Sequence, residues 1–392
     1  MTHSTPLVTR MRSYGPTIFD EMSALARRTG AINLGQGFPD VDGPAEVLEA
    51  ARAAIAGGYN QYSPLQGYPE LREAIAEHQQ RFYGIDLDPD REVLVTVGAT
   101  EAITATILAL CEPGDEVVTF EPYYDSYAAA ISLAGATRRT SVLRFPDFAV
   151  DEQSLRAAFS ERTRVVLLNT PHNPTGKVFT RHELELIGSL AREYDAWVVT
   201  DEVYEHLTFE DAQHVPMSTL PDMAERTITI SSGGKTFSTT GWKVGWLSGP
   251  EPLVTAARTV KQYLSYVGSG PFQPAIAQAL RLGDDYYKQF QTGMQAKRDL
   301  LVGSLTDVGL TVRNPAGTYF VLADVAPLGA QDAVDFCWRM PELCGVVGVP
   351  VSVFHDDKDA ARTLVRFAFC KQDDVMQEAV RRLGTLHPGT AE

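Results

Sequence analysis

Predicted strands and helices alternate along the chain from Glu92 to Asp201. Short runs of Val, Leu and Ile predict buried strands, and segments with apolar residues at helical spacing lie between them. The predicted strands are 93–97, 116–120, 136–142, 164–169 and 197–201. This alternation predicts an α/β fold, in which helices cover both faces of a mainly parallel sheet.

The rest of the chain predicts a second, smaller unit. A chain of 392 residues is long enough for two domains. After residue 250 a helical region runs toward residue 291, and short strands then alternate with helices. We therefore expect a large domain over 46–290, a small α+β domain over 291–392, and an N-terminal arm over 1–45 that joins the small domain.

Three polar residues lie where predicted strands end. Asn173 follows the strand 164–169, Asp201 ends the next one, and Lys235 follows a strand-like run at 227–230. Because ligands bind beyond the carboxyl ends of parallel strands, we expect these three side chains to belong to one site.

Lys235 lies in a stretch of small residues, 231–246, with apolar flanks. Glycines there let the backbone approach a ligand closely, and a desolvated lysine amine forms Schiff bases with carbonyl cofactors. Lys243, in the same stretch, could neutralise a phosphate. We interpret Lys235 as the Schiff-base lysine for pyridoxal phosphate. The alternative is a glycine-rich turn between a strand and a buried segment.

A second anion-binding feature is predicted at residues 98–101, which lead directly from a strand into an apolar helix. We expect Thr100 to be the N-cap of this helix. Small residues at a helix N-terminus leave N–H groups and the helix dipole open to an anion.

Composition excludes several classes of partner. There are 34 Lys and Arg against 50 Asp and Glu, and the formal net charge of −16 argues against nucleic acid. The four cysteines, Cys111, Cys337, Cys344 and Cys370, form no C-x-x-C pair and no cluster with histidine, so we expect neither a metal site nor a disulfide framework. Residues 1–15 carry no signal-peptide pattern, and no apolar run is long enough to span a membrane. We expect a cytoplasmic protein.

Four motifs, in this order along the chain, resemble the class I and II aminotransferases, which are fold type I pyridoxal-phosphate enzymes. The motifs are Pro171-His172-Asn173-Pro174-Thr175-Gly176, Thr200-Asp201-Glu202-Val203-Tyr204, Ser232-Gly233-Gly234-Lys235 with Gly241-Trp242-Lys243-Val244-Gly245, and Val365-Arg366-Phe367. The resemblance covers nearly the whole chain. Residues 33–40 and 235–238 are similar to the branch that holds the kynurenine, glutamine, methionine and N-succinyldiaminopimelate transaminases.

The resemblance implies roles for the cofactor-binding residues. Lys235 would hold the cofactor aldehyde and then shuttle a proton from the substrate Cα, and Asp201 would pair with the pyridine nitrogen. The other residues implied are Asn173 and Tyr204 at the phenolic oxygen, Tyr124 on the ring face, Ala99, Thr100, Ser232 and Lys243 at the phosphate, and Tyr62 from a neighbouring subunit. The chain departs from the family at Lys243, where arginine is frequent, and loses a bidentate fork there.

From the residues alone, plainer interpretations remain open for several of these positions. Asp201 is equally well a helix N-cap, Tyr204 a core residue and Tyr124 one of three tyrosines at a helix start. We assign no chemistry to His172 or His206. His78 is interpreted as a satisfied residue on a helix face.

Arg366 is expected to bind the substrate α-carboxylate, since an arginine inside an apolar strand is costly to bury without an anion. Gly37 and Asn173 are expected beside the same carboxylate. Tyr14, Tyr263 and Tyr266 are expected in the remaining pocket.

The implied activity is transfer of an amino group between an amino acid and a 2-oxo acid, with glutamate and 2-oxoglutarate as one pair, by a homodimer with shared active sites. N-succinyldiaminopimelate, methionine, glutamine, kynurenine and aromatic amino acids are all candidate substrates. The alternative is a carbon–sulfur β-lyase that acts on cysteine conjugates through the same lysine. A regulator that keeps the cofactor fold is disfavoured, because only a short arm precedes the enzyme pattern and the charge is acidic.

Overall fold

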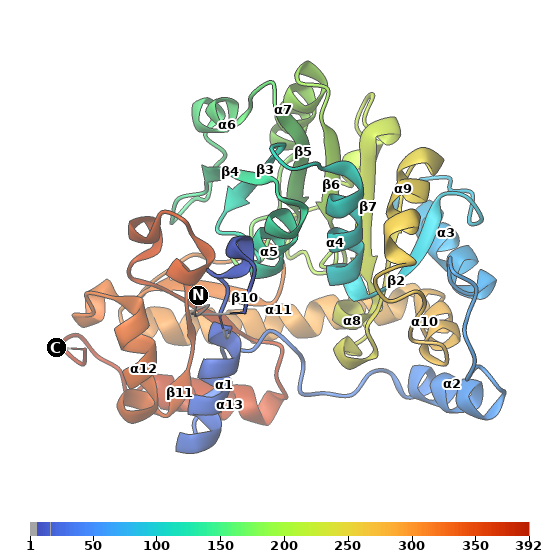
Figure 1. Cartoon of the computed structure of the whole chain (residues 1–392). Helices are drawn as coiled ribbons and strands as arrows, with labels where there is room; N and C mark the ends of the chain where they lie inside the picture. The colour runs from blue at the N-terminus through green and yellow to red at the C-terminus, as the bar shows by residue number, and fades with distance from the viewer. Residues whose placement is uncertain (1–5, 16, 392) are drawn as a thin grey trace.

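The computed structural model describes residues 6–15 and 17–391, so residues 1–5 and 16 of the predicted arm lie outside this description. The centre of the molecule is a seven-stranded sheet in the order β2-β8-β7-β6-β5-β3-β4 (Figure 1). Its strands are β2 Val93–Val97, β3 Glu116–Glu121, β4 Thr137–Val142, β5 Thr163–Asn169, β6 Trp197–Asp201, β7 Thr227–Ser232 and β8 Val244–Ser248.

All neighbouring strands of this sheet run parallel except at β8, which is antiparallel to both β2 and β7. The prediction of an α/β fold with a mainly parallel sheet is confirmed. β8 is missing from the predicted strands, because it lies in the glycine-rich motif around Gly245, which is typical of a loop.

Helices cover both faces of the sheet. On one face α4 Gly98–Leu110, α5 Asp125–Ala134 and α9 Glu251–Lys261 share an apolar cluster with Val165 and Leu167. On the other face α6 Glu152–Ala158 and α7 Arg181–Glu193 pack with Val166 and Leu168. At the β2 edge lie α2 Ala45–Ala56, α3 Pro69–Tyr83 and α10 Phe272–Leu280. The continuous apolar runs that predict the strands therefore belong to strands buried on both faces.

The second part of the chain forms a four-stranded antiparallel sheet in the order β12-β13-β10-β9. Its strands are β9 Thr311–Val312, β10 Phe320–Asp324, β12 Val349–Pro350 and β13 Leu364–Ala368, with α12 Ala333–Cys344 and α13 Asp373–Leu383 beside them. The N-terminal segment joins this part: after α1 Ile18–Thr29, β1 Ile32–Asn33 pairs with β11 Val346–Val347.

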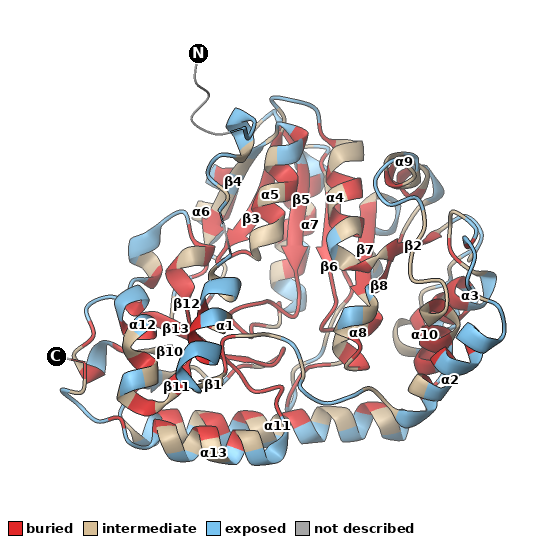
Figure 2. Ribbon diagram, turned by 60° about the horizontal axis from the view of Figure 1, so that its bottom comes forward, coloured by how far each residue is buried: buried red, intermediate tan, exposed pale blue. Residues whose placement is uncertain are grey.

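A long helix, α11 Asp284–Asp307, connects the two parts and runs along the whole underside of the molecule (Figure 2). The domain boundary expected at 290/291 lies within this helix, and the division of the chain into domains stays a prediction. Among the described residues, no helix has the length and apolar character needed to cross a bilayer.

Two local predictions are wrong. Thr100 is not the N-cap of α4: Gly98, with φ +72°, turns the chain immediately after β2, so α4 begins there with Val97 as its N-cap. The sequence also predicts a break over 268–274 in the helical region after residue 250, but the break lies earlier, over 262–271 after the end of α9, and α10 begins at Phe272. Pro274 lies in its first turn, where no intrahelical N–H bond is lost.

Candidate active site

A cavity of about 280 Å³ opens at the carboxyl ends of the parallel strands, where the two parts of the chain meet. Every predicted site residue lines it except four tyrosines, Tyr14, Tyr62, Tyr263 and Tyr266. The predicted residues that line it are Gly37, Ala99, Thr100, Tyr124, Asn173, Asp201, Tyr204, Ser232, Lys235, Lys243 and Arg366. The structure thus brings together residues from 37 to 366, which the motifs alone could not place side by side.

Lys235 lies on a single helical turn, α8 Gly233–Thr236, directly after β7. Its Nζ is 3.5 Å from the carbonyl oxygen of Gly37. Loss of hydration lowers the pKa of Lys235 to about 8, and the positive charges of Arg366 and Lys243 add to this effect, whereas Cys370 and Asp201 oppose it. An amine with a pKa near 8 is partly neutral at physiological pH, so it can act as nucleophile and base.

Asp201 ends β6 and is buried at the floor of the cavity. The Tyr127 hydroxyl donates to its Oδ2 at 2.6 Å and the Val203 N–H to its Oδ1 at 3.3 Å. Burial raises the pKa of Asp201 to about 6, although the Tyr127 hydrogen bond opposes the rise. A cationic ring nitrogen placed here would pair with the carboxylate and favour its ionised form.

The start of α4 forms an anion-binding corner. The first N–H groups of this helix have no partner within the helix, and Ala99 and Thr100 line the cavity. Lys243 lies against this corner: a Cβ atom at Gly98 would be 3.0 Å from its Nζ, and one at Gly245 would be 2.4 Å from the Gly98 carbonyl carbon. The glycines therefore allow the helix dipole and a lysine to act on the same anion.

Arg366, in β13, is buried with 1% of its surface exposed. It donates from Nη1 to Asn173 Oδ1 at 3.0 Å and from Nη2 to the Gly35 carbonyl at 2.8 Å. Its Nε has no partner, and among the described residues no carboxylate forms an ion pair with it. Burial lowers its pKa to about 10. A buried guanidinium without a counter-ion is a binding site for a carboxylate.

Three aromatic rings enclose the Arg366 guanidinium. Its Cζ lies 4.1 Å from the ring centroid of Phe320, 5.0 Å from that of Phe19 and 5.3 Å from that of Phe354. The rings exclude water from the charge and leave its approach from the cavity open.

The remaining predicted tyrosines lie outside the cavity of their own chain. Tyr62 is 81% exposed and Tyr263 is 83% exposed, and Tyr62 packs edge-on against Tyr266 at 5.4 Å between ring centroids. The Tyr14 hydroxyl instead shares a hydrogen bond with Ser132 Oγ at 2.7 Å.

Several cavity residues are missing from the sequence prediction. Asn169 Oδ1 accepts from the Asn173 N–H at 2.7 Å, and its Nδ2 donates to the Asp201 carbonyl at 2.8 Å, so it ties β5, β6 and the following loop together. A polar residue at the end of a buried strand is a signal that could have identified Asn169. Tyr127 and Phe320 carry no such signal, because each resembles an ordinary core residue in the sequence.

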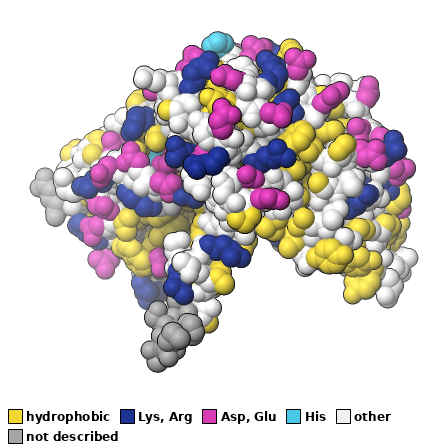
Figure 3. All heavy atoms as spheres, turned by 45° about the horizontal axis from the view of Figure 1, so that its top comes forward, with side chains coloured by type: hydrophobic (Ala, Val, Ile, Leu, Met, Phe, Trp, Pro, Cys, Tyr) yellow, Lys and Arg dark blue, Asp and Glu magenta, His cyan; other side chains and the backbone are white. Residues whose placement is uncertain are grey.

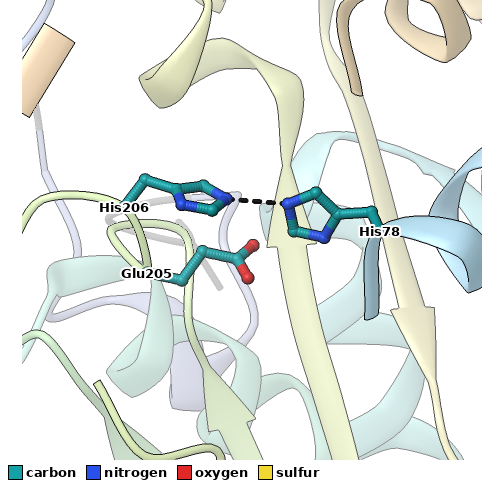
Figure 4. A group of neighbouring side chains, drawn as sticks. All are labelled: His78, Glu205 and His206. Atoms are coloured by element: carbon teal, nitrogen blue, oxygen red, sulfur yellow. Dashed lines mark hydrogen bonds between the residues drawn. The ribbon is translucent and has the colours of Figure 1, made fainter. Parts of the chain in front are cut away.

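A separate group, His78, Glu205 and His206, has the composition of a zinc site (Figure 4). The two Nε2 atoms are only 2.7 Å apart. Two nitrogens bound to one zinc ion in a tetrahedral site are about 3.3 Å apart, so this pair is closed by a direct N–H···N hydrogen bond. Glu205 is bound by the Ser231 hydroxyl at 2.7 Å. We assign no metal to this group, and His78 is the satisfied residue that its helix face predicts.

Buried histidines make the fold sensitive to acid. Burial lowers the pKa of His172 to about 3, whereas an unfolded histidine titrates near 6.5. The unfolded state therefore binds more protons below that pH, and the free energy of unfolding falls as the pH is lowered. We predict that, between pH 8 and pH 5, wild type loses about 2 kcal/mol more stability than His172→Gln in urea unfolding. His182→Gln, at an exposed histidine, is the control and should keep the wild-type pH dependence. An equal slope in all three proteins would contradict the assignment.

The profile of the family described as "Aminotransferase class I and II" matches residues 29–383. A probable N-succinyldiaminopimelate aminotransferase from Mycobacterium tuberculosis is 51% identical over 390 residues, covering 97% of this chain and 98% of the relative. Methionine aminotransferase from Escherichia coli is 41% identical over 385 residues, covering 98% of this chain and all of the relative (100%).

Solved structures agree with this. The N-succinyldiaminopimelate aminotransferase of Mycobacterium tuberculosis superimposes with a TM-score of 0.94 at 52% identity, covering 96% of this chain and 99% of the other. Aspartate aminotransferase from Thermus thermophilus with maleate gives a TM-score of 0.89 at 33% identity, covering 97% and 99%.

Proposed function

Because the chain belongs to the class I and II aminotransferase family, we propose that its cavity transfers an amino group between N-succinyldiaminopimelate and 2-oxoglutarate. The enzyme is a pyridoxal-phosphate-dependent transaminase of fold type I. The substrate pair rests on the relative at 51% identity, while the relative at 41% makes methionine the second candidate. The aminotransferase relatives give no support to the β-lyase alternative.

The described residues fit pyridoxal phosphate. The anion-binding corner of α4, the buried Asp201 carboxylate and Lys235 all line the same cavity. We assign the phosphate to the N–H groups of Ala99 and Thr100 together with Ser232 and Lys243. When bound, the cofactor supplies an electron sink for the charge that develops on the substrate Cα.

The remaining residues hold and orient the ring. Asp201 would keep the ring nitrogen protonated, and the Tyr127 hydrogen bond fixes the direction of this carboxylate. Asn173 and Tyr204 are assigned to the phenolic oxygen, and Tyr124 to the ring face. Lys235 would hold the cofactor aldehyde, and its Nζ, when free, would accept the proton from the substrate Cα.

The observation that carries the substrate side of the proposal is the unpaired Arg366 guanidinium in the same cavity as Lys235. Its Nε without a partner and the Asn173 amide beside it suit the α-carboxylate of an amino acid, and Gly37 lines the same cavity. Because Lys235 lines this cavity too, a substrate bound through its carboxylate would share the space with the lysine amine, as proton transfer requires.

We also propose a cytoplasmic homodimer in which Tyr62 reaches the phosphate of the neighbouring subunit. Figure 3 shows hydrophobic side chains gathered beside a hollow on one face of the molecule. Tyr62, Tyr263, Leu264 and Tyr266 are exposed large hydrophobic residues, which are typical of a surface that another chain covers. The four free, buried cysteines suit a reducing compartment.

The substrate proposal is tested by steady-state kinetics with 2-oxoglutarate as acceptor. We expect kcat/KM for N-succinyldiaminopimelate to exceed that for methionine and kynurenine by about tenfold or more. A substrate that lacks a group the pocket binds loses about 1–3 kcal/mol of transition-state stabilisation. A preference for methionine of similar size would assign the enzyme to the second candidate. Pyruvate and ammonia released from a cysteine conjugate, without an acceptor, would restore the lyase.

Arg366→Lys tests the carboxylate site. Lysine keeps the charge and loses the two-pronged contact, so we expect KM for the amino acid to rise about 10- to 100-fold. Arg298→Lys is the matched control, because Arg298 is equally buried and pairs with Glu210 and Asp299 outside the cavity. The half-reaction with a primary amine that lacks a carboxylate should be equally slow in wild type and Arg366→Lys. An unchanged KM for the amino acid would remove Arg366 from the substrate site.

A further inference from the structure

Tyr319 lies immediately before β10 and belongs to none of the four sequence motifs. Its side chain is 0% exposed and does not line the cavity. Its hydroxyl donates a hydrogen bond to the carbonyl oxygen of Gly37 at 2.6 Å. The same oxygen is the acceptor 3.5 Å from Lys235 Nζ, and within the described ranges this is the one hydrogen bond that the lysine amine makes.

The two contacts use the two lone pairs of one carbonyl oxygen. The Tyr319 hydroxyl takes one of them, which leaves the other for the amine. Lys235 Nζ also lies 5.8 Å from the ring centroids of both Tyr204 and Tyr319, whose rings meet edge-on at 5.2 Å. The amine therefore rests between two rings, with a single fixed acceptor.

Gly37 itself is held tightly. A Cβ atom at this position would lie 2.5 Å from Cζ of Phe320, so the glycine backbone packs directly on that ring. On the other side Lys371 Nζ donates to the carbonyl of Phe38 at 2.8 Å. These contacts fix the position of Gly37, while the direction of its carbonyl depends on the Tyr319 hydrogen bond.

The backbone before Tyr319 is strained. Thr318 has φ +65°, a conformation that is a genuine outlier for a β-branched residue. It persists because its N–H donates to the Leu207 carbonyl at 2.9 Å and the Gly317 N–H donates to the Gly176 carbonyl at 2.8 Å. These partners lie in the loops that carry Tyr204 and Asn173. Strain that is held in place from two cofactor loops points to a functional requirement for where Tyr319 lies.

We propose that Tyr319 is a positioning residue for Lys235, which it acts on through the Gly37 carbonyl. The inference rests on the proposed role of Lys235 as the base. When Nζ has accepted the proton from the substrate Cα, its N–H groups need an acceptor, and the Gly37 oxygen holds the nitrogen beside the reacting carbon. Without the Tyr319 hydroxyl this oxygen is free to reorient, and the proton transfer slows while substrate binding at Arg366 is unaffected.

Tyr319→Phe tests this, because it removes the hydroxyl and keeps the buried ring. Tyr287→Phe is the matched control: the Tyr287 hydroxyl also donates to a backbone carbonyl, that of Leu280 at 3.1 Å, from a buried site outside the cavity. Both proteins are loaded with pyridoxal phosphate. Three measurements are made, each with an amino acid that the wild-type enzyme accepts where a substrate is needed. They are kcat and KM, the isotope effect on kcat when the substrate carries deuterium at Cα, and the pH dependence of the visible cofactor absorbance.

For Tyr319→Phe we expect kcat to fall about tenfold, because a barrier raised by the free energy of one hydrogen bond slows the reaction by about this factor. KM should stay within twofold of the wild-type value. The isotope effect should rise, because proton transfer becomes rate-limiting, and the absorbance titration should shift. Tyr287→Phe should match wild type in all four quantities.

Equal values for the two variants would overturn the inference. A Tyr319→Phe protein that fails to fold or to bind the cofactor would also overturn it, because the hydroxyl would then be required for the structure. A raised KM with unchanged kcat would also overturn it. Failure of the proposed function looks different: wild type itself would show no cofactor absorbance and no amino transfer.

Discussion

The active site depends on an excess of positive charge in its cavity, where cationic side chains outnumber carboxylates. Lys235, Lys243 and Arg366 all line it, and Asp201 is the buried carboxylate that faces them. Lost hydration lowers the pKa of Lys235 to about 8, with repulsion from Arg366 and Lys243 adding to the effect, and burial lowers the pKa of Arg366 to about 10. In the proposed function the ligands supply the missing negative charge, with the phosphate at α4 and the carboxylate at Arg366. The uncompensated positive charge that is costly to bury would therefore make the cavity selective for its cofactor and substrate.

Much of the fold could be predicted from the sequence, because strands buried on both faces leave a simple pattern. β2 and β6 match their predicted ranges, and β5 differs by one residue. The prediction failed where local chemistry was ambiguous. β8 contains Gly245 and follows a loop-like motif, so its sequence does not look like a strand. Its strand form depends on pairing with β2 and β7, and β2 is far away along the chain. Gly98 starts α4 earlier than Thr100 suggests, and this depends on a positive φ that no pattern reveals.

Site residues could be predicted from the sequence where they belong to a motif. They could not be predicted where their role depends on a contact with a residue far away along the chain. Asp201, Lys235 and Arg366 follow from strand ends and family resemblance, and the cavity contains all three. Tyr127, which holds Asp201, lies 74 residues away along the chain. Tyr319 reaches Gly37 across 282 residues. Nothing local distinguishes either tyrosine from core packing, so only the folded chain reveals them.

The central claim is that Lys235, and no other lysine, carries the cofactor. The direct measurement is borohydride reduction of the purified protein with pyridoxal phosphate, followed by mass spectrometry of its peptides. The account predicts one stable label per chain, on the peptide that contains Lys235, together with loss of the visible band in Lys235→Ala. Lys261→Ala, which removes a buried lysine outside the cavity, should keep both label and band. A label on Lys243 or on another lysine, or no label at all, would contradict the account.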